Sequence, residues 1–192
     1  MERMKKPITN MDDYAELMAK HLRTLRHFER CLFSVWCADH LLTSHAEHLE
    51  ENMSELDLRT LQEIVNDLWD SLLGGVIPET DQLNALDMEF MGNNDEWSAP
   101  MKDIHPAVSI VKQSIGMCIL CCRRNDVGLA QTIAQLVIDC VECTLEENGP
   151  SFSPDTLFEH PQIQHELETQ LAMIKHLKGE YDLDSNLRMM FR

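Results

Sequence analysis

The chain has 192 residues, with 16 Lys and Arg against 33 Asp and Glu, and its formal net charge at pH 7 is −17. A charge of this sign is repelled by nucleic acid and by anionic membrane surfaces, so we expect neither as a partner. The length suits one domain over residues 1–192, and because no signal peptide or membrane span stands out, we expect a cytoplasmic protein.

Apolar residues recur at helical spacing along nearly the whole chain, and no run alternates in the two-residue manner of an exposed strand. The sequence therefore predicts an all-α fold, a single-domain helical bundle. In the first part of the chain we expect a helix capped by Asn10, a second apolar stripe over residues 25–36 and a short helix over residues 45–53. A strong helix capped by Asp57 follows, and it ends at Gly74.

The region from residue 76 to 103 is predicted to be the longest irregular segment, an acidic loop with room for one short helix near residues 81–88. Pro106 fits the first turn of the next helix, and a turn at Asn125 leads into another helix that stops near Asn148. These two helices should pair as an antiparallel hairpin.

Two further helices are expected near the C-terminus, one beginning at Pro154 and one running from Pro161 to Gly179, with a short tail after Tyr181. No repeat at a fixed period and no low-complexity tract interrupts this pattern. The chain should therefore form antiparallel helix pairs around one core.

Three short blocks, spread over nearly the full chain, carry a resemblance to a known family. They are residues 31–41 followed by Ile64-Val65-Asn66-Asp67-Leu68-Trp69-Asp70, then His105-Pro106-Ala107-Val108, and then Glu159-His160-Pro161-Gln162-Ile163. With matching gaps, they make the chain resemble the bacterial YjaG-like family, catalogued as domain of unknown function four hundred and sixteen. The resemblance implies an all-helical soluble fold and leaves a role in signalling open, but it transfers no activity and no catalytic residue. The cysteine-rich segment 118–122 and the heavier acidity depart from the family pattern.

The acidity is concentrated in one stretch of the sequence. Residues 39–98 contain fifteen Asp and Glu against a single Arg59. Within the strong predicted helix, Glu63, Asp67 and Asp70 fall on one side and form an acidic stripe that faces away from the core. Like charges so close together repel one another, which favours a use for this surface in binding.

We therefore predict a non-enzymatic protein-protein interaction module, an inhibitor or immunity-type protein whose acidic 39–98 segment binds a basic protein partner. Phe90 and Trp97 either anchor that contact or, equally, pack into the core. The expected contact residues are Glu47, Glu50, Glu51, Glu55, Glu63, Asp67, Asp70, Phe90, Asp95, Glu96 and Trp97. Two alternatives stay open, a signalling adaptor that uses an apolar helix face and a metal or thiol redox protein, and a homodimer is open as well.

The cysteines contain the spacing of a four-cysteine zinc site, with one pair at Cys118 and Cys121 and the other at Cys140 and Cys143. On an antiparallel hairpin that turns near Asn125, however, the two pairs would be displaced by about eleven residues, or roughly 16 Å along the helices. We therefore expect reduced, mostly buried thiols and no zinc.

The histidines offer a second metal-ligand pattern, with His40, His45 and His48 at helical spacing near Glu47 and Glu51. An H-E-x-x-H arrangement is missing, and a solvated acidic helix has the same pattern. We therefore expect no cofactor, no metal ligand and no catalytic residue.

Overall fold

The structure is a computed structural model that describes residues 8–92, 105–148 and 156–191. All regular structure in these ranges is helical, which confirms the predicted all-α single-domain fold. The elements are α1 (Met11–Leu22), α2 (His27–Ser44), α3 (Ala46–Asn52), α4 (Glu55–Leu73), α5 (Thr80–Gly92), α6 (Pro106–Arg123), α7 (Val127–Asn148), a 3₁₀ turn η1 (Leu157–Glu159), α8 (Pro161–Leu177) and α9 (Ser185–Met189).

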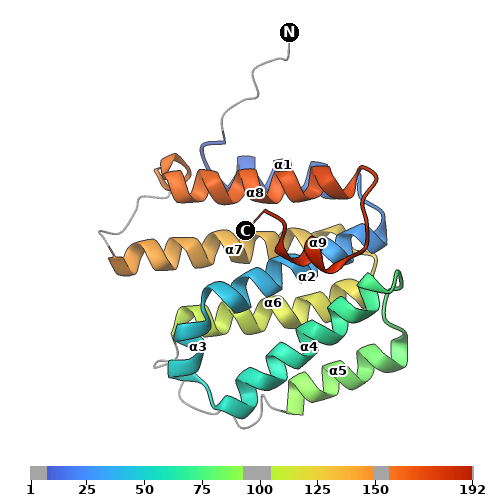
Figure 1. The fold of residues 1–192 in the computed structure, drawn as a ribbon. Helices are drawn as coiled ribbons and strands as arrows, with labels where there is room; N and C mark the ends of the chain where they lie inside the picture. Colours follow the sequence, from blue (N-terminus) through green and yellow to red (C-terminus); the bar gives the residue numbers. More distant parts are fainter. Residues whose placement is uncertain (1–7, 93–104, 149–155, 192) are drawn as a thin grey trace.

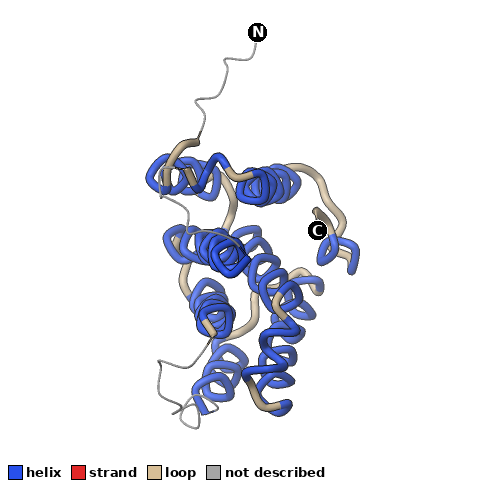
Figure 2. Tube along the Cα trace, turned by 90° about the vertical axis from the view of Figure 1, so that its left-hand side faces the viewer, coloured by secondary structure: helices blue, strands red, loops and turns tan. Residues whose placement is uncertain are grey.

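Three helices form the centre of the bundle, and the others cover it from two ends. Helices α2, α6 and α7 pack against one another, and α6 and α7 make the predicted hairpin (Figure 1). Helices α1 and α8 pack against α7 at one end, whereas α4 packs on α2 and α5 packs on α6 at the other (Figure 2). Helices α4 and α5, which carry much of the acidic stretch, thus lie at one end of the stack.

Helix α2 is buried on nearly every side because other helices surround it. The run from Cys31 to Asp39 has less than a tenth of each residue exposed, and Trp36 from this run joins Trp69 of α4 among the largest buried side chains. The small residues Cys31, Ser34, Cys37 and Ala38 let the neighbouring helices approach closely. The stripe predicted over residues 25–36 is therefore one part of an all-round buried helix.

The helix starts largely follow the predicted capping chemistry. The Asn10 side chain accepts a hydrogen bond from the backbone N–H of Asp13 at 2.9 Å, as expected for the cap of α1. The cap predicted at Asp57 is wrong, because α4 begins one turn earlier and is capped by Ser54. Ser54 Oγ accepts from the Asp57 N–H at 3.1 Å and donates to the Asp57 carboxylate at 2.7 Å, so Asp57 is the partner of the cap.

The structure differs from the predicted elements in two other places. Helix α5 runs from Thr80 to Gly92, so more of the predicted irregular segment is helical than the short stretch expected there. Helix α9 was not predicted, since five residues in isolation are too few to form a stable helix. It is held by Leu187, which is buried in the core. The helix start expected at Pro154 lies outside the described residues.

One segment of α7, Val127–Glu147, is long and apolar enough to cross a membrane by length and composition alone, although the sequence analysis identified no such segment. Helix α7 packs against α1, α2, α6 and α8. The central helix of a packed bundle has the same composition, because it is covered on several sides.

Candidate functional site

The carboxylate at the start of the acidic stretch, Asp39, is turned inward and neutralised. Its oxygens accept from Nε and Nη2 of Arg188 at 2.7 and 2.8 Å, and Trp69 Nε1 lies 3.3 Å from Oδ2. Arg188 also donates to the side chain of Asn66 at 2.8 Å. The bidentate pair of Arg188 and Asp39 links α9 to α2, and the contact with Asn66 links α9 to α4. Asp39 therefore stabilises the fold and does not belong to an exposed acidic surface.

The remaining acidic residues of the described stretch form an outer surface, which we call the acidic layer and define as residues 46–92 of α3, α4 and α5. It contains twelve Asp and Glu and one Arg. Helix α4 packs against both α3 and α5, so the three helices are neighbours. Seven of the predicted contact residues lie here and are exposed, namely Glu47, Glu50, Glu51, Glu55, Glu63, Asp67 and Asp70.

Apart from Arg59 within the layer, the cations that approach it in the described ranges do so at its edges. Arg123 of α6 pairs with Asp87 at 3.1 Å. Burial lowers the pKa of Lys112, and the nearby carboxylate of Asp57 partly opposes that shift. Asp70 lies near Arg188 and helps to raise the pKa of that guanidinium, although the hydrogen bond to Asp39 is the larger cause. Within the described ranges, none of the seven exposed carboxylates forms an ion pair.

Of the two predicted apolar anchors, Phe90 lies within the described residues and Trp97 does not. Phe90 is half-buried at the end of α5, and its ring lies so close to Gly116 that a Cβ there would meet Cε1 at 3.1 Å. Phe90 therefore packs against α6, while Met88 and Met91 on the same helix are exposed by 76% and 58%. The other three predicted contact residues, Asp95, Glu96 and Trp97, lie outside the described residues.

The two cysteine pairs face different neighbours. The Cys118 thiol donates to the carbonyl oxygen of Ser34 at 3.1 Å, whereas the Cys140 sulfur lies 3.0 Å from Nε2 of His45. The four sulfurs do not come together as a ligand group in the described structure. Burial raises the pKa of Cys140 to about 12 and that of Cys118 well above its ordinary value, so both stay protonated near neutral pH.

The predicted histidine group is split among three neighbours. His40 Nε2 lies 3.6 Å from the buried carboxylate of Glu166, and His45 faces the thiol of α7. His48 stacks on His105 at the start of α6, with ring centres 4.4 Å apart. Glu47 and Glu51, the carboxylates considered as ligands, point to solvent. The sequence interpretation missed His105 because it is far along the chain, and a His directly before the helix-starting Pro106 was its one local signal.

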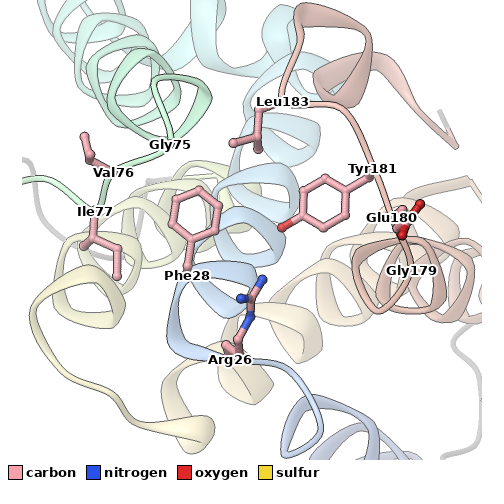
Figure 3. A pocket seen from close by; sticks show the side chains of 9 residues that line it. All are labelled: Arg26, Phe28, Gly75, Val76, Ile77, Gly179, Glu180, Tyr181 and Leu183. Atoms are coloured by element: carbon pink, nitrogen blue, oxygen red, sulfur yellow. The ribbon is translucent and has the colours of Figure 1, made fainter.

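An open groove of about 770 Å³ lies where the N-terminus of α2, the α4–α5 turn and the segment before α9 meet (Figure 3). It is lined by Arg26, Phe28, Gly75, Val76, Ile77, Gly179, Glu180, Tyr181 and Leu183. Arg26 donates to the buried Glu29 at 2.7 Å, and the Tyr181 hydroxyl lies 3.5 Å from the same carboxylate. Gly75 has φ +82°, a conformation that favours glycine in the turn that forms one wall. The groove is lined mostly by apolar residues, and Arg26 and Glu180 are its charged lining residues.

Comparison with known proteins places the chain in a family. The family described as "Protein of unknown function (DUF416)" matches residues 17–191, so the chain belongs to it, and the resemblance inferred from the three sequence blocks is confirmed. No curated protein and no solved structure matches the chain.

Proposed function

We propose that this member of the DUF416 family is an acidic protein-protein interaction module, an inhibitor or immunity-type protein that binds a basic partner through its acidic layer. One observation carries the proposal. The seven exposed carboxylates of α3 and α4 form no ion pair among the described residues, whereas the buried carboxylates Asp39 and Glu29 are each paired with an arginine.

Helix α4 carries more of the layer's carboxylates than either α3 or α5. Glu63, Asp67 and Asp70 are exposed on it, and they are spaced by four and three residues, so they stand on one side of the helix. Mutual repulsion makes this arrangement unfavourable in the free protein, and a surface of Lys and Arg relieves that repulsion on binding. Complementary charge of this kind mainly speeds association and selects the partner.

Apolar side chains within the same layer supply what charge alone lacks. Leu56 of α4 is 58% exposed, and Met88 and Met91 of α5 are more than half exposed. A stable interface needs a few desolvated apolar groups inside a polar rim. Leu56 stands between Glu55 and Asp57 in the chain, and Met88 stands between Asp87 and Glu89, which fits that description. The three exposed apolar side chains replace Phe90 as the candidate anchors, because the Phe90 ring packs on α6.

The test compares two charge-matched variants in a pull-down from the native cell at low salt, eluted with a salt gradient. The first variant, E63Q/D67N/D70N, removes three carboxylates from the acidic layer. The control, E168Q/E180Q/D182N, removes three exposed carboxylates from α8 and the loop after it. We expect the wild type and the control to retain the same basic protein and the first variant to lose it, with elution at moderate salt. Equal retention by both variants would contradict the proposal.

The same experiment distinguishes the adaptor alternative, which the exposed methionines of α5 favour. An apolar contact hardly responds to salt, so the partner would stay bound through the gradient. In that case the substitution Met88→Gln, at a side chain that is 76% exposed, should release the partner while E63Q/D67N/D70N should not.

A further inference from the structure

We propose that His48, His105 and Glu147 form a binding site for a divalent transition metal, zinc foremost. The three side chains come from α3, the residue that caps α6, and α7. Their ligand atoms all lie within 4.8 Å of one another, and they are the one such group in the described ranges. The convergence of two imidazoles and a carboxylate from three separate elements is the observation that carries the inference.

The contacts within this group are close. His105 Nε2 lies 2.6 Å from an oxygen of Glu147, and the His48 and His105 rings are parallel to within 9° with centres 4.4 Å apart. The two histidines are half-buried and Glu147 is exposed, so an ion can reach the group from solvent. A carboxylate beside two stacked imidazoles offers a cation both charge and donor atoms.

The donor set matches zinc chemistry. Two imidazole nitrogens and one carboxylate oxygen hold zinc in many sites that leave the fourth position to water. A tetrahedral ion with bonds near 2.1 Å keeps its ligand atoms about 3.4 Å apart. The pair of His105 and Glu147 atoms now 2.6 Å apart must therefore open, and ligand atoms that are farther apart, all within 4.8 Å, must close. Nitrogen donors favour zinc and its neighbours over magnesium and calcium.

Binding has one defined cost at His105. Its Nδ1 accepts the backbone N–H of Ala107 at 3.2 Å, so in the neutral ring the proton is on Nε2 and faces Glu147. A metal at Nε2 displaces that proton, and the ring then carries its proton on Nδ1. The ion therefore replaces the hydrogen bond to Glu147 and ends the capping contact to Ala107.

The surroundings favour a cation and hold one ligand in place. His45 stacks on His48 with ring centres 6.1 Å apart, and it lies 3.0 Å from the Cys140 sulfur on α7. Glu146 is exposed next to Glu147, and burial raises the pKa of Cys143, with smaller contributions from Glu142, Glu146, Asp139 and Glu147. The local charge is thus negative, and neither Cys140 nor Cys143 belongs to the group of converging ligand atoms, which points to nitrogen and oxygen ligands.

The test is a calorimetric titration of zinc into full-length protein stripped with a chelator. We expect one zinc per chain, not displaced by excess magnesium, and a zinc-dependent rise in melting temperature. His48→Ala and Glu147→Gln, which remove no helix cap, should each weaken binding at least roughly 100-fold, more than the loss of a supporting residue does. The control His165→Ala removes an exposed histidine of α8 and should bind as the wild type does.

Circular dichroism of each variant distinguishes loss of folding from loss of the metal site. Cobalt in place of zinc should give visible bands without the near-ultraviolet band of a thiolate ligand. Absence of stoichiometric zinc, unchanged binding in folded His48→Ala and Glu147→Gln, or a cobalt-thiolate band would each overturn the proposal. E63Q/D67N/D70N should keep its zinc, so this site and the acidic layer stand or fall separately.

Discussion

The buried carboxylates of the bundle and the carboxylates on the acidic layer are placed in opposite environments. Asp39 is 1% exposed and held by two hydrogen bonds from Arg188, and Glu166 accepts from Gln170 at 2.9 Å. Glu63 and Asp67 on α4 are exposed and have no such partner in the described part of the chain. A buried charge needs a partner because desolvation is costly, whereas an exposed one is stabilised by water.

This contrast explains how a chain with half as many cations as anions folds. The chain has 16 Lys and Arg for 33 Asp and Glu, and several of those cations are engaged by inward or edge carboxylates. The surplus negative charge is left on the surface, above all on the acidic layer. Removing a charge should therefore destabilise the centre and hardly affect the layer.

The largest effect is expected from Arg188→Ala. It leaves Asp39 almost fully buried with Trp69 Nε1 as its remaining side-chain donor among the contacts described above. Removing one partner of a buried ion pair leaves an uncompensated charge, so we expect the free energy of unfolding to fall by about 3 kcal/mol. Urea denaturation followed by circular dichroism measures the change.

A double-mutant cycle provides the control for this pair. In the Asp39→Asn background no buried charge remains, so Arg188→Ala should cost much less there than in the wild type. If Arg188→Ala costs the same in both backgrounds, the arginine acts by packing α9 and the ion pair is not the cause.

The second largest effect is expected at Gln170, a neutral side chain that partners the buried carboxylate of Glu166. Gln170 is fully buried, accepts from the Tyr14 hydroxyl at 2.8 Å and donates to Glu166 and to the Ala134 carbonyl. Gln170→Leu should cost about 2 kcal/mol, since it leaves buried polar groups without partners. Gln62→Leu, at an exposed position of α4, should change the free energy of unfolding little. Equal effects of the two substitutions in urea denaturation would refute this reading of Gln170.

Helical periodicity predicted most of this fold, because apolar spacing and capping residues act within one turn of a helix. The starts of α1, α6 and α8 and the end of α4 at Gly74 follow from Asn10, Pro106, Pro161 and the glycine. Periodicity could not predict α9, whose stability comes from Arg188 and its contacts with distant helices. A five-residue helix has too little local signal to be recognised.

The sequence also indicated the acidic stripe but not the group of His48, His105 and Glu147, because only the stripe depends on local helix geometry. The exposure of the acidic stripe follows from helix geometry, since Glu63, Asp67 and Asp70 lie opposite the apolar face of one helix. The group of His48, His105 and Glu147 depends on how α3, α6 and α7 pack, which no local pattern encodes. Local spacing instead suggested Glu47 and Glu51, which the fold turns to solvent.

Asp139 lies between the two kinds of carboxylate, being half-buried with no partner among the described residues. Burial, with a smaller contribution from Glu142, raises its pKa to about 6. The unfolded chain has the ordinary value of about 4, so ionisation above pH 6 destabilises the fold and protonation below about pH 4 removes that cost. Asp139→Asn should therefore stabilise the protein at pH 7.5 by about 1 kcal/mol, after allowance for solvent screening.

Melting curves at several pH values test this prediction. The gain from Asp139→Asn should shrink as the pH falls through 6 and vanish near pH 4. A gain that stays constant over that range would show that the asparagine stabilises by packing. Glu168→Gln, at an exposed carboxylate of α8, is the control and should give no such pH-dependent gain. Asp184→Asn would not serve, because the Asp184 carboxylate caps α9.

The smallest effect on stability is expected for E63Q/D67N/D70N, which removes exposed carboxylates of the acidic layer in place of buried ones. Repulsion between neighbours one turn apart should make the variant more stable by about 0.5 kcal/mol at low salt, partly offset because Asp70 attracts Arg188. The gain should fade in high salt, since screening already weakens the repulsion in the wild type. A loss of stability would mean that these carboxylates support the fold. A small gain in stability combined with a lost partner would instead mean that their charge is kept for binding.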